Sequence, residues 1–281
     1  MDAVEVLAAR GIRAEIVNAD AMQLYRGMDI ATAKLRPEER RGIPHHMLDI
    51  LDVTEGSTAA GYQTVVESLI EQLESEGVWP ILVGGSGLYI SAVLFGFAFP
   101  ARDPELRARL ERELENEGPD VLHERLRQLD PRAAADIDPA NGRRTVRALE
   151  AVTVTGQPFR ASLPSSEPVR PTRIAHLRAE RALLVERLDA RVEGFWRAGL
   201  LDEVQTLRDQ GLEQGTTARQ AIGYAQALQQ LGGELTEAEA IDATKLATRK
   251  YSRRQVSWFK RYVADEPAPN AARDWIASVL D

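Results

Sequence analysis

The sequence predicts an α/β fold in which a parallel sheet is flanked by helices. Two short, largely apolar segments, 14–17 and 78–83, have the composition of strands, and each follows a segment whose apolar residues recur at helical spacing. The second segment, VWPILV, is apolar throughout, which is typical of a strand buried on both faces. Helices that alternate with buried strands favour a parallel, doubly wound sheet.

Each helix and strand of this pattern has a recognisable end. A helix is expected over residues 2–10, where apolar residues recur at helical spacing before Gly11. It leads into the first strand. The apolar residues of 65–73 predict a second helix, which Gly77 ends immediately before the strand 78–83. The order helix, strand, helix, strand is therefore complete within the first third of the chain.

The turn GGSG, residues 84–87, follows the second strand and opens the apolar helix LYISAVLF. Two interpretations of this turn stay open. It is either a tight helix start with room for a neighbouring backbone, or a substrate contact in which Ser86 supplies a hydroxyl. The turn lacks the lysine and hydroxyl that complete the phosphate loop GxxxxGK[ST], and that motif occurs nowhere in the sequence.

The middle of the chain predicts a separate helical unit. Residues 102–155 contain several helical segments rich in Arg and Glu and almost no strand pattern, and a Pro- and Ser-rich connector follows them. We assign residues 101–161 to a helical insertion domain, and residues 1–100 and 162–281 to the α/β catalytic core with its carboxyl-terminal helices.

After the insertion, the segment TRIAHLRA (172–179) predicts that the sheet resumes. Helices dominate the remainder of the chain. Thr236 and Glu239 form a capping-box signature, which predicts a long final helix over residues 237–263.

Composition excludes several classes of protein. The 281 residues contain no cysteine, so disulfides and cysteine-based metal sites are excluded. No apolar run approaches the roughly 18 residues of a membrane-spanning helix, and the amino terminus lacks the pattern of a secretion signal. We expect a cytoplasmic protein without a membrane partner. The net charge of -8 argues against nonspecific coating of nucleic acid, although a local basic face is compatible with it.

A series of motifs carries a family resemblance. The segment NADAMQLYRGMDIATAK (18–34) matches the pattern D-[SA]-x-x-x-Y-x-G-x-D-I-x-T-A-K. Further blocks follow in order: PHHMLDI (44–50), LVGGSGLY (82–89), DPELR (103–107), RRTVRALE (143–150), RVEGFWRAGLLDEV (191–204), AIGY (221–224) and ATRKYSRRQVSWFK (247–260). Through this ordered set the chain resembles the bacterial tRNA dimethylallyltransferase family, also called tRNA isopentenyltransferases.

The resemblance implies a P-loop-NTPase-like fold and a specific reaction. The family transfers a dimethylallyl group from dimethylallyl diphosphate to N6 of adenosine 37, beside the anticodon of tRNA. The implied partners are therefore a tRNA anticodon stem-loop and dimethylallyl diphosphate, the implied cofactor is Mg²⁺, and the implied state is a monomer. Departures from the family pattern include Ala31 for a frequent glycine, Ser86 for a common threonine and Ala225 for a basic residue.

The largest departure is that the family's first strand and its phosphate loop, GPTxxGK[ST], are absent from this sequence. A helix at residue 2 that leads into a buried parallel strand also implies an earlier strand, because such sheets are built from β-α-β crossovers. We expect a truncated chain or a start codon assigned too far downstream. Because the loss of one preorganised donor costs about 100 to 1,000 fold in rate, we expect little activity from the chain as given.

Two residues are the catalytic candidates. Asp20 follows the first strand at its carboxyl end, where open α/β sheets place their chemistry. The N6 amine is a poor nucleophile, so a carboxylate that accepts its proton would assist the attack. A turn cap is the alternative for an isolated aspartate, and the matched block favours the general base. Arg249 matches the family arginine that stabilises the departing diphosphate, and a solvated helix charge is its alternative.

The remaining candidates are substrate-binding residues. The matched blocks place them at Ala21, Met22, Gln23, Thr32, Lys34, Ser86, Arg107, Arg143, Arg144, Arg147, Gly223, Tyr224 and Arg253. Between residues 243 and 264 there are seven Lys or Arg residues and no acidic residue, which indicates phosphate contacts. Lys245, Arg249 and Arg253 recur every four residues and share one helical face. Tyr224 and Trp258 are candidates for base stacking, with core packing as the favoured alternative.

The adjacent pair His45 and His46 does not predict a metal site, because neighbouring side chains point in different directions and no third imidazole is near in sequence. A role in fixing the loop between a strand and a helix is the preferred interpretation, and no residue is assigned as a metal ligand.

Three other functions stay open at this stage. Adenylate isopentenyltransferase would share the chemistry of Asp20 and Arg249 without needing an extended basic surface. A non-catalytic tRNA-binding remnant would keep the basic surface, although it predicts decay of the catalytic block. A small-molecule kinase is least favoured, because it would need the missing phosphate loop.

Overall fold

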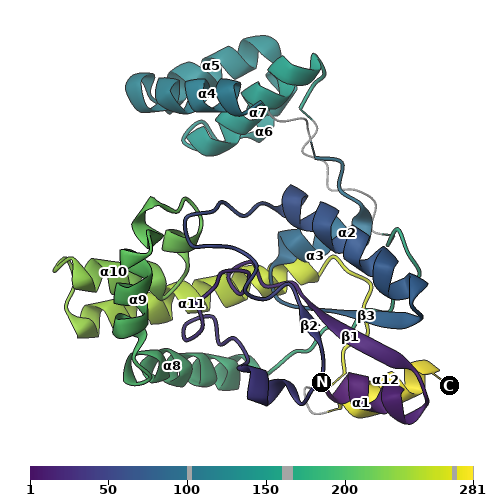
Figure 1. The fold of residues 1–281 in the computed structure, drawn as a ribbon. Coiled ribbons are helices and arrows are strands. Elements are labelled where there is room, and N and C mark those ends of the chain that lie inside the picture. Colours follow the sequence, from purple (N-terminus) through teal and green to yellow (C-terminus); the bar gives the residue numbers. More distant parts are fainter. Residues whose placement is uncertain (100–102, 160–166, 268–270, 281) are drawn as a thin grey trace. The chain divides into compact units, whose positions relative to one another are not determined.

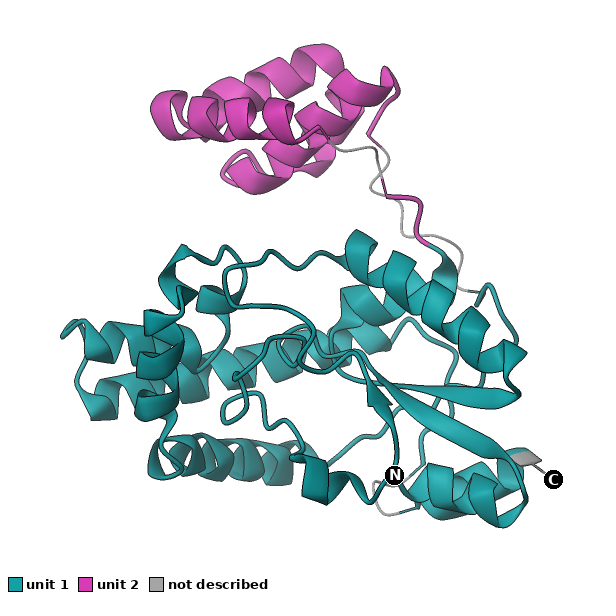
Figure 2. Cartoon of the chain, in the orientation of Figure 1, with its two compact units in different colours: residues 1–96, 166–281 teal, residues 97–165 magenta. Residues whose placement is uncertain are grey.

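The protein is described by a computed structural model that covers residues 1–99, 103–159, 167–267 and 271–280. The chain forms two compact units: residues 1–96 and 166–281 make the first, and residues 97–165 make the second (Figure 2). The boundaries expected from the sequence, 101 and 161, lie outside the described residues.

The first unit begins with the sheet and its covering helices (Figure 1). Its elements before the insertion are α1 (Asp2–Ala9), β1 (Arg13–Asn18), η1 (Pro37–Arg40), β2 (His45–His46), α2 (Ala59–Ser75), β3 (Val78–Val83) and α3 (Gly87–Phe95). After the insertion come α8 (Arg181–Arg197), α9 (Leu200–Asp209), η2 (Leu212–Gln214), η3 (Ala218–Gln220), α10 (Tyr224–Leu231), α11 (Glu237–Phe259) and α12 (Ala272–Leu280).

The sheet is parallel, as the alternation of helix and strand predicts. Within the described residues it has the order β2-β1-β3, so β1 is central. All six residues of β1 pair in register with β3, from Arg13 opposite Val78 to Asn18 opposite Val83. On its other edge β1 pairs with the two residues of β2, with Ile16 opposite His45. The predicted α/β class with a parallel sheet is confirmed.

Helices cover both faces of the sheet. Successive strand residues point to opposite faces, and Ile16 and Val17 on β1 are both buried. Val17 belongs to a core cluster with Tyr62, Val66, Ile70 and Leu73 of α2, together with Val93 of α3. Ile16 belongs to a separate cluster with residues of α1 and with Ile276 of α12. Figure 1 shows α1 and α12 together, away from α2 and α3.

Two predictions about strands are wrong. Residues 172–179 do not extend the sheet: they form a single parallel bridge, Ala175 with Asp265, in which His176 N donates to Asp265 O at 2.8 Å and Asp265 N to Ile174 O at 2.8 Å. The partner is the extended chain after α11, so this segment anchors the carboxyl-terminal region. His45 and His46 were expected to fix a loop, whereas they form β2 and pair with β1.

The long final helix is confirmed, with a shorter end than expected. Thr236 and Glu239 form the predicted capping box, in which Thr236 N donates to Glu239 Oε2 at 2.8 Å and Glu239 N donates to Thr236 Oγ1 at 3.3 Å. The helix ends at Phe259, four residues before the predicted end at Val263, because the chain closes into a turn in which Tyr262 N donates to Phe259 O.

The second unit is a bundle of four described helices: α4 (Pro104–Glu117), α5 (Pro119–Leu129), α6 (Pro131–Asp136) and α7 (Gly142–Thr155). Asp103, Asp130 and Asn141 cap three of these helices with their side chains. The unit has its own apolar core, which includes Leu110, Leu122, Leu126, Val146 and Leu149. Among the described residues of the whole chain, no helix is long and apolar enough to cross a membrane.

Candidate active site

Asp20 lies just beyond the carboxyl end of the central strand. Asn18 ends β1 and organises the turn: its Nδ2 donates to Met47 O at 2.9 Å, and its Oδ1 accepts from Asp20 N at 3.1 Å. Beyond the turn, Met22 N donates to Oδ1 of Asp20 at 2.9 Å. The carboxylate is thus fixed to the backbone that follows it, at the position where parallel sheets carry their functional groups.

Burial and hydrogen bonding act in opposite directions on Asp20. Burial, the larger cause, raises the pKa of its carboxyl above the ordinary value of 3.8, while the backbone N–H groups of Met22 and Gln23 lower it. The net shift is upward, so Asp20 is a stronger base than an exposed aspartate. A carboxylate of this kind is suited to accept a proton from a bound substrate.

The turn GGSG lies directly against the chain that precedes Asp20. A Cβ atom on Gly84 would lie 2.4 Å from the carbonyl carbon and oxygen of Ala19, so only glycine fits there without a shift of the backbone. Ala19 N donates to Val83 O at 2.7 Å, and Ser86 Oγ accepts from Ala21 N at 3.0 Å. The turn therefore leaves room for a neighbouring backbone. The Ser86 hydroxyl contacts the backbone N–H of Ala21, the residue that follows Asp20.

Three tyrosines surround this region, and the sequence analysis did not single them out. Tyr62 OH donates to Asn18 O at 2.7 Å, the hydroxyls of Tyr89 and Ser57 are 2.8 Å apart, and Tyr251 OH donates to Gly85 O at 3.3 Å. Burial, with the charge of Asp20 as a further cause, raises the pKa of all three phenols. Tyr89 and Tyr251 lie in the matched blocks LVGGSGLY and ATRKYSRRQVSWFK, whereas Tyr62, which has the spacing of a core residue on α2, lies in none of the blocks.

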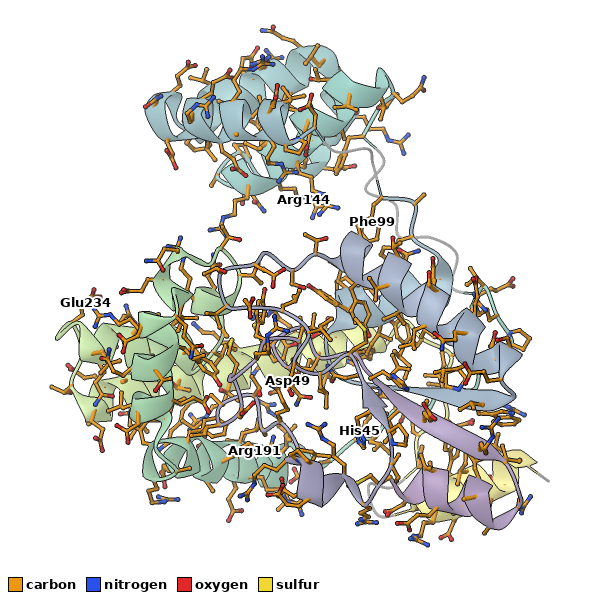
Figure 3. The ribbon with its side chains drawn as sticks, viewed as in Figure 1. His45, Asp49, Phe99, Arg144, Arg191 and Glu234 are labelled. Atoms are coloured by element: carbon orange, nitrogen blue, oxygen red, sulfur yellow. The ribbon has the colours of Figure 1, made fainter. Side chains whose placement is uncertain are left out.

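Several predicted substrate-binding residues hold the loop after Asp20 in place. Gln23 Nε2 donates to Thr32 O at 3.0 Å. The Nζ of Lys34 is buried and donates to Tyr25 O at 2.7 Å, to Asp29 Oδ1 at 2.7 Å and to Asp49 Oδ1 at 2.6 Å, with Asp49 labelled in Figure 3. These contacts hold the loop in its folded form. A contact with substrate stays a prediction for Gln23, Thr32 and Lys34.

Gly223 and Tyr224 contribute to the packing around the same loop. Gly223 has a φ of +92°, and a Cβ atom there would lie 2.7 Å from the side chain of Ala31. Tyr224 is completely buried in a cluster with Tyr25 and Met28. Tyr224 therefore packs in the core in this structure, as the alternative to base stacking predicts.

The three basic residues predicted to share one face of α11, Lys245, Arg249 and Arg253, divide into two groups. Arg249 makes two hydrogen bonds with Asp189 of α8, one of them from Nε to Oδ1 at 2.8 Å, and Lys245 Nζ lies 2.7 Å from Glu193 Oε1 of the same helix. The Arg249 guanidinium lowers the pKa of the Asp189 carboxyl. Arg253, by contrast, is exposed. The predicted basic face thus contains two cations that join α8 to α11 and one that faces solvent.

Trp258, the second stacking candidate, packs against the turn that opens α3. Its Nε1 donates to Ser91 Oγ at 2.9 Å, and a Cβ atom on Gly87 would lie 2.5 Å from its ring. In this structure Trp258 therefore packs against α3.

The insertion arginines belong to the second unit. Arg107 donates from Nε to Glu150 Oε2 at 3.0 Å, and Asp103 N donates to Glu150 Oε1 at 3.1 Å, so Arg107 joins α4 to α7. Arg143 and Arg144, in the first turn of α7, are exposed, and Arg144 is labelled in Figure 3. Arg147 is half-buried one turn further along the helix.

His45 and His46 each have a protein partner. His46 Nε2 lies 2.6 Å from Glu15 Oε2, and His45 Nδ1 lies 2.8 Å from Ile43 O. In the described part of the chain, no group of three or more His, Cys, Asp or Glu residues is arranged so that it could hold a metal ion. Mg²⁺ usually binds through one or two carboxylates together with substrate phosphates, and its binding to this chain stays a prediction.

The family of the chain follows from a comparison with known proteins. A model of the IPP transferase family matches residues 23–262. The chain belongs to this family. Among curated IPP transferases, the tRNA dimethylallyltransferase of Clavibacter sepedonicus is 59% identical over 263 residues, which cover 93% of this chain and 85% of that protein. The tRNA dimethylallyltransferase of Thermobifida fusca is 53% identical over 255 residues, which cover 91% of this chain and 80% of that protein.

A solved IPP transferase shares the fold. The full-length tRNA isopentenylpyrophosphate transferase of Bacillus halodurans superimposes with a TM-score of 0.69 at 34% identity, covering 99% of this chain and 91% of that one. The resemblance to tRNA dimethylallyltransferases that the motifs predict is confirmed, and so is the predicted P-loop-NTPase-like fold class.

Proposed function

We propose that this chain transfers a dimethylallyl group from dimethylallyl diphosphate to N6 of adenosine 37 in the anticodon stem-loop of tRNA. The observation that carries the proposal is the position of Asp20: a half-buried carboxylate with an upward-shifted pKa, held by Met22 N at the end of the central strand. The N6 lone pair is delocalised into the adenine ring. Proton acceptance by Asp20 as the amine attacks would make it a better nucleophile.

The leaving diphosphate needs positive charge where its own charge develops. Arg249 is the candidate side chain, and its pair with Asp189 fixes the guanidinium between α8 and α11. We assign to Mg²⁺ the neutralisation of the phosphate oxygens when it is bound with the substrate. A tRNA substrate supports a cytoplasmic location, and we propose a monomer as the active state.

The test is an assay of the modified nucleoside. Purified chain is incubated with dimethylallyl diphosphate, Mg²⁺ and unmodified tRNA, both alone and extended at its amino end by the strand and phosphate loop that the family resemblance implies. We expect N6-dimethylallyladenosine at position 37, identified by mass spectrometry of nuclease fragments. Transfer to adenosine monophosphate in preference to tRNA would identify an adenylate isopentenyltransferase, and transfer by neither form would refute the proposal.

Two arginines of α11 allow catalysis to be separated from tRNA binding. We expect Arg249→Ala to lower the single-turnover transfer rate about 100 fold, because it removes a cation from the leaving group. Arg253→Ala should instead weaken tRNA binding and reduce the slope of log Kd against log salt concentration by about one, because one phosphate contact is lost. Equal effects of both variants on the salt slope would contradict the separate roles.

A further inference from the structure

Glu203 places a carboxylate against the loop that follows Asp20. It lies in the first turn of α9, where its Oε1 accepts from Asp29 N at 3.2 Å and its Oε2 accepts from Ile30 N at 3.1 Å. The hydroxyl of Tyr224 donates to Oε1 at 2.5 Å. One carboxylate thus joins the start of α9, the start of α10 and two consecutive amides of the loop.

Packing alone does not account for a carboxylate in this place. Tyr224, which donates to Glu203, belongs to an apolar cluster that includes Val204, Leu207 and Met28. Burial raises the pKa of the Glu203 carboxyl, which shows that the surroundings disfavour its charge, while the donors from Tyr224 and the loop lower it. Only a side chain with an acceptor can hold the two loop amides at this position.

A continuous set of contacts leads from Glu203 to Asp20. The loop amides that Glu203 holds lie in the turn 28–32, in which Thr32 Oγ1 donates to Met28 O at 2.6 Å. Thr32 O accepts from Gln23 Nε2 at 3.0 Å. The backbone N–H of Gln23 is, with that of Met22, one of the two donors that lower the pKa of the Asp20 carboxyl.

We infer that Glu203 is a positioning residue for the transfer reaction: it holds the turn 28–32 against α9 and, through Gln23, keeps the backbone donors of Asp20 in place. This inference rests on the proposed role of Asp20 as the general base. Small displacements of a reacting group cost about 100 fold in rate, so a residue that fixes the base contributes to catalysis without touching substrate.

The experiment follows the ionisation of Asp20 directly. The sequence has four methionines, so labelling with [¹⁵N]methionine gives few amide signals, and Met22 N is the group that donates to Asp20. The pH dependence of the Met22 amide shift reports the Asp20 titration without substrate or turnover. We expect Glu203→Ala to raise the titration midpoint by about half a pH unit or more, because weaker donation disfavours the carboxylate.

Three further variants make the test specific. Glu203→Gln keeps an acceptor for the loop amides, so its Met22 midpoint should lie close to that of the wild type. Tyr224→Phe removes only the phenol donor and should give a smaller upward shift than Glu203→Ala. Asp202→Asn is the matched control: it removes a charge from the same helical turn, at an exposed side chain that makes no hydrogen bond or ion pair within the described residues.

Kinetics supply the second readout. We expect Glu203→Ala to lower the single-turnover transfer rate about 10 to 100 fold with a nearly unchanged Kd for tRNA, and Glu203→Gln to restore most of the rate. An unchanged or lowered Met22 midpoint in Glu203→Ala, or equal shifts in Glu203→Ala and Asp202→Asn, would overturn the inference. Absence of transfer in the wild type with the expected midpoint shifts would refute the proposed function and leave the positioning of Asp20 by Glu203 standing.

Discussion

Asp20→Asn is expected to lower the rate of dimethylallyl transfer about 1,000 fold, within the range that general-base catalysis contributes. The amide keeps the shape of the carboxylate and an oxygen that can accept from Met22 N, but it cannot take up the proton of the attacking amine. The rate is measured in single-turnover reactions with saturating tRNA, in the most active of the forms described above. A rate within threefold of the wild type would exclude Asp20 as the base.

The pH dependence gives an independent measure of the same group. Because burial raises the pKa of Asp20 above 3.8, the acid limb of kcat/KM should lie at a higher pH than for an exposed aspartate. Activity should fall as the pH decreases through this raised pKa, since the protonated carboxyl cannot accept a proton. A profile that stays flat down to pH 4 would contradict the assignment.

Thermal unfolding separates loss of the base from loss of the fold. The folded state holds the Asp20 proton more tightly than the unfolded state, so stability falls as the pH rises from the unfolded pKa through the raised folded pKa, and the full cost is present above it. Asp20→Asn removes that cost and should raise the Tm at pH 7, with a smaller difference at acid pH. A lower Tm at pH 7 would show that the substitution disturbs the strand end.

The sequence was sufficient for the elements that local pattern determines. The alternation of helix and strand predicted that the strands now seen as β1 and β3 belong to one parallel sheet, because buried strands that alternate with helices form such sheets. It failed for the segment 172–179. Its apolar residues Ala175 and Leu177 alternate as in a strand, and the actual partner of Ala175, Asp265, lies ninety residues further along the chain. Pairing over that separation leaves no local signal.

For the site as well, the sequence predicted which residues take part but not which contacts they make. The motif brought Asp20, Gln23 and Thr32 into one block, and the structure places them in one folded loop. The motif did not show that Lys34 would be buried among three acceptors, since an isolated lysine in a sequence has a solvated face as its usual surroundings. The block RVEGFWRAGLLDEV contains Glu203, but it did not show the contacts of Glu203 with the loop, which span more than 170 residues of sequence.

Gly84→Ala is expected to disrupt the site through the backbone alone. The added methyl group would lie 2.4 Å from the carbonyl of Ala19, a backbone atom that no rotamer change can move. The ends of β1 and β3 must separate, which weakens the bonds from Ala19 N to Val83 O and from Ser86 N to Ala19 O. We expect a loss of about 3 kcal/mol in the free energy of unfolding and a fall of at least about 100 fold in the transfer rate.

Gly194→Ala is the matched control for this substitution. Gly194 lies inside α8, and a Cβ atom there would meet nothing within 4 Å, so the same methyl group is added without a clash. Alanine favours helix over glycine by up to about 1 kcal/mol, so this variant should be slightly stabilised and fully active. Urea unfolding and single-turnover transfer measure both variants. Equal stabilities of Gly84→Ala and Gly194→Ala would show that the strand ends tolerate a side chain, and that close contact between the turn and Ala19 does not hold Asp20 in position.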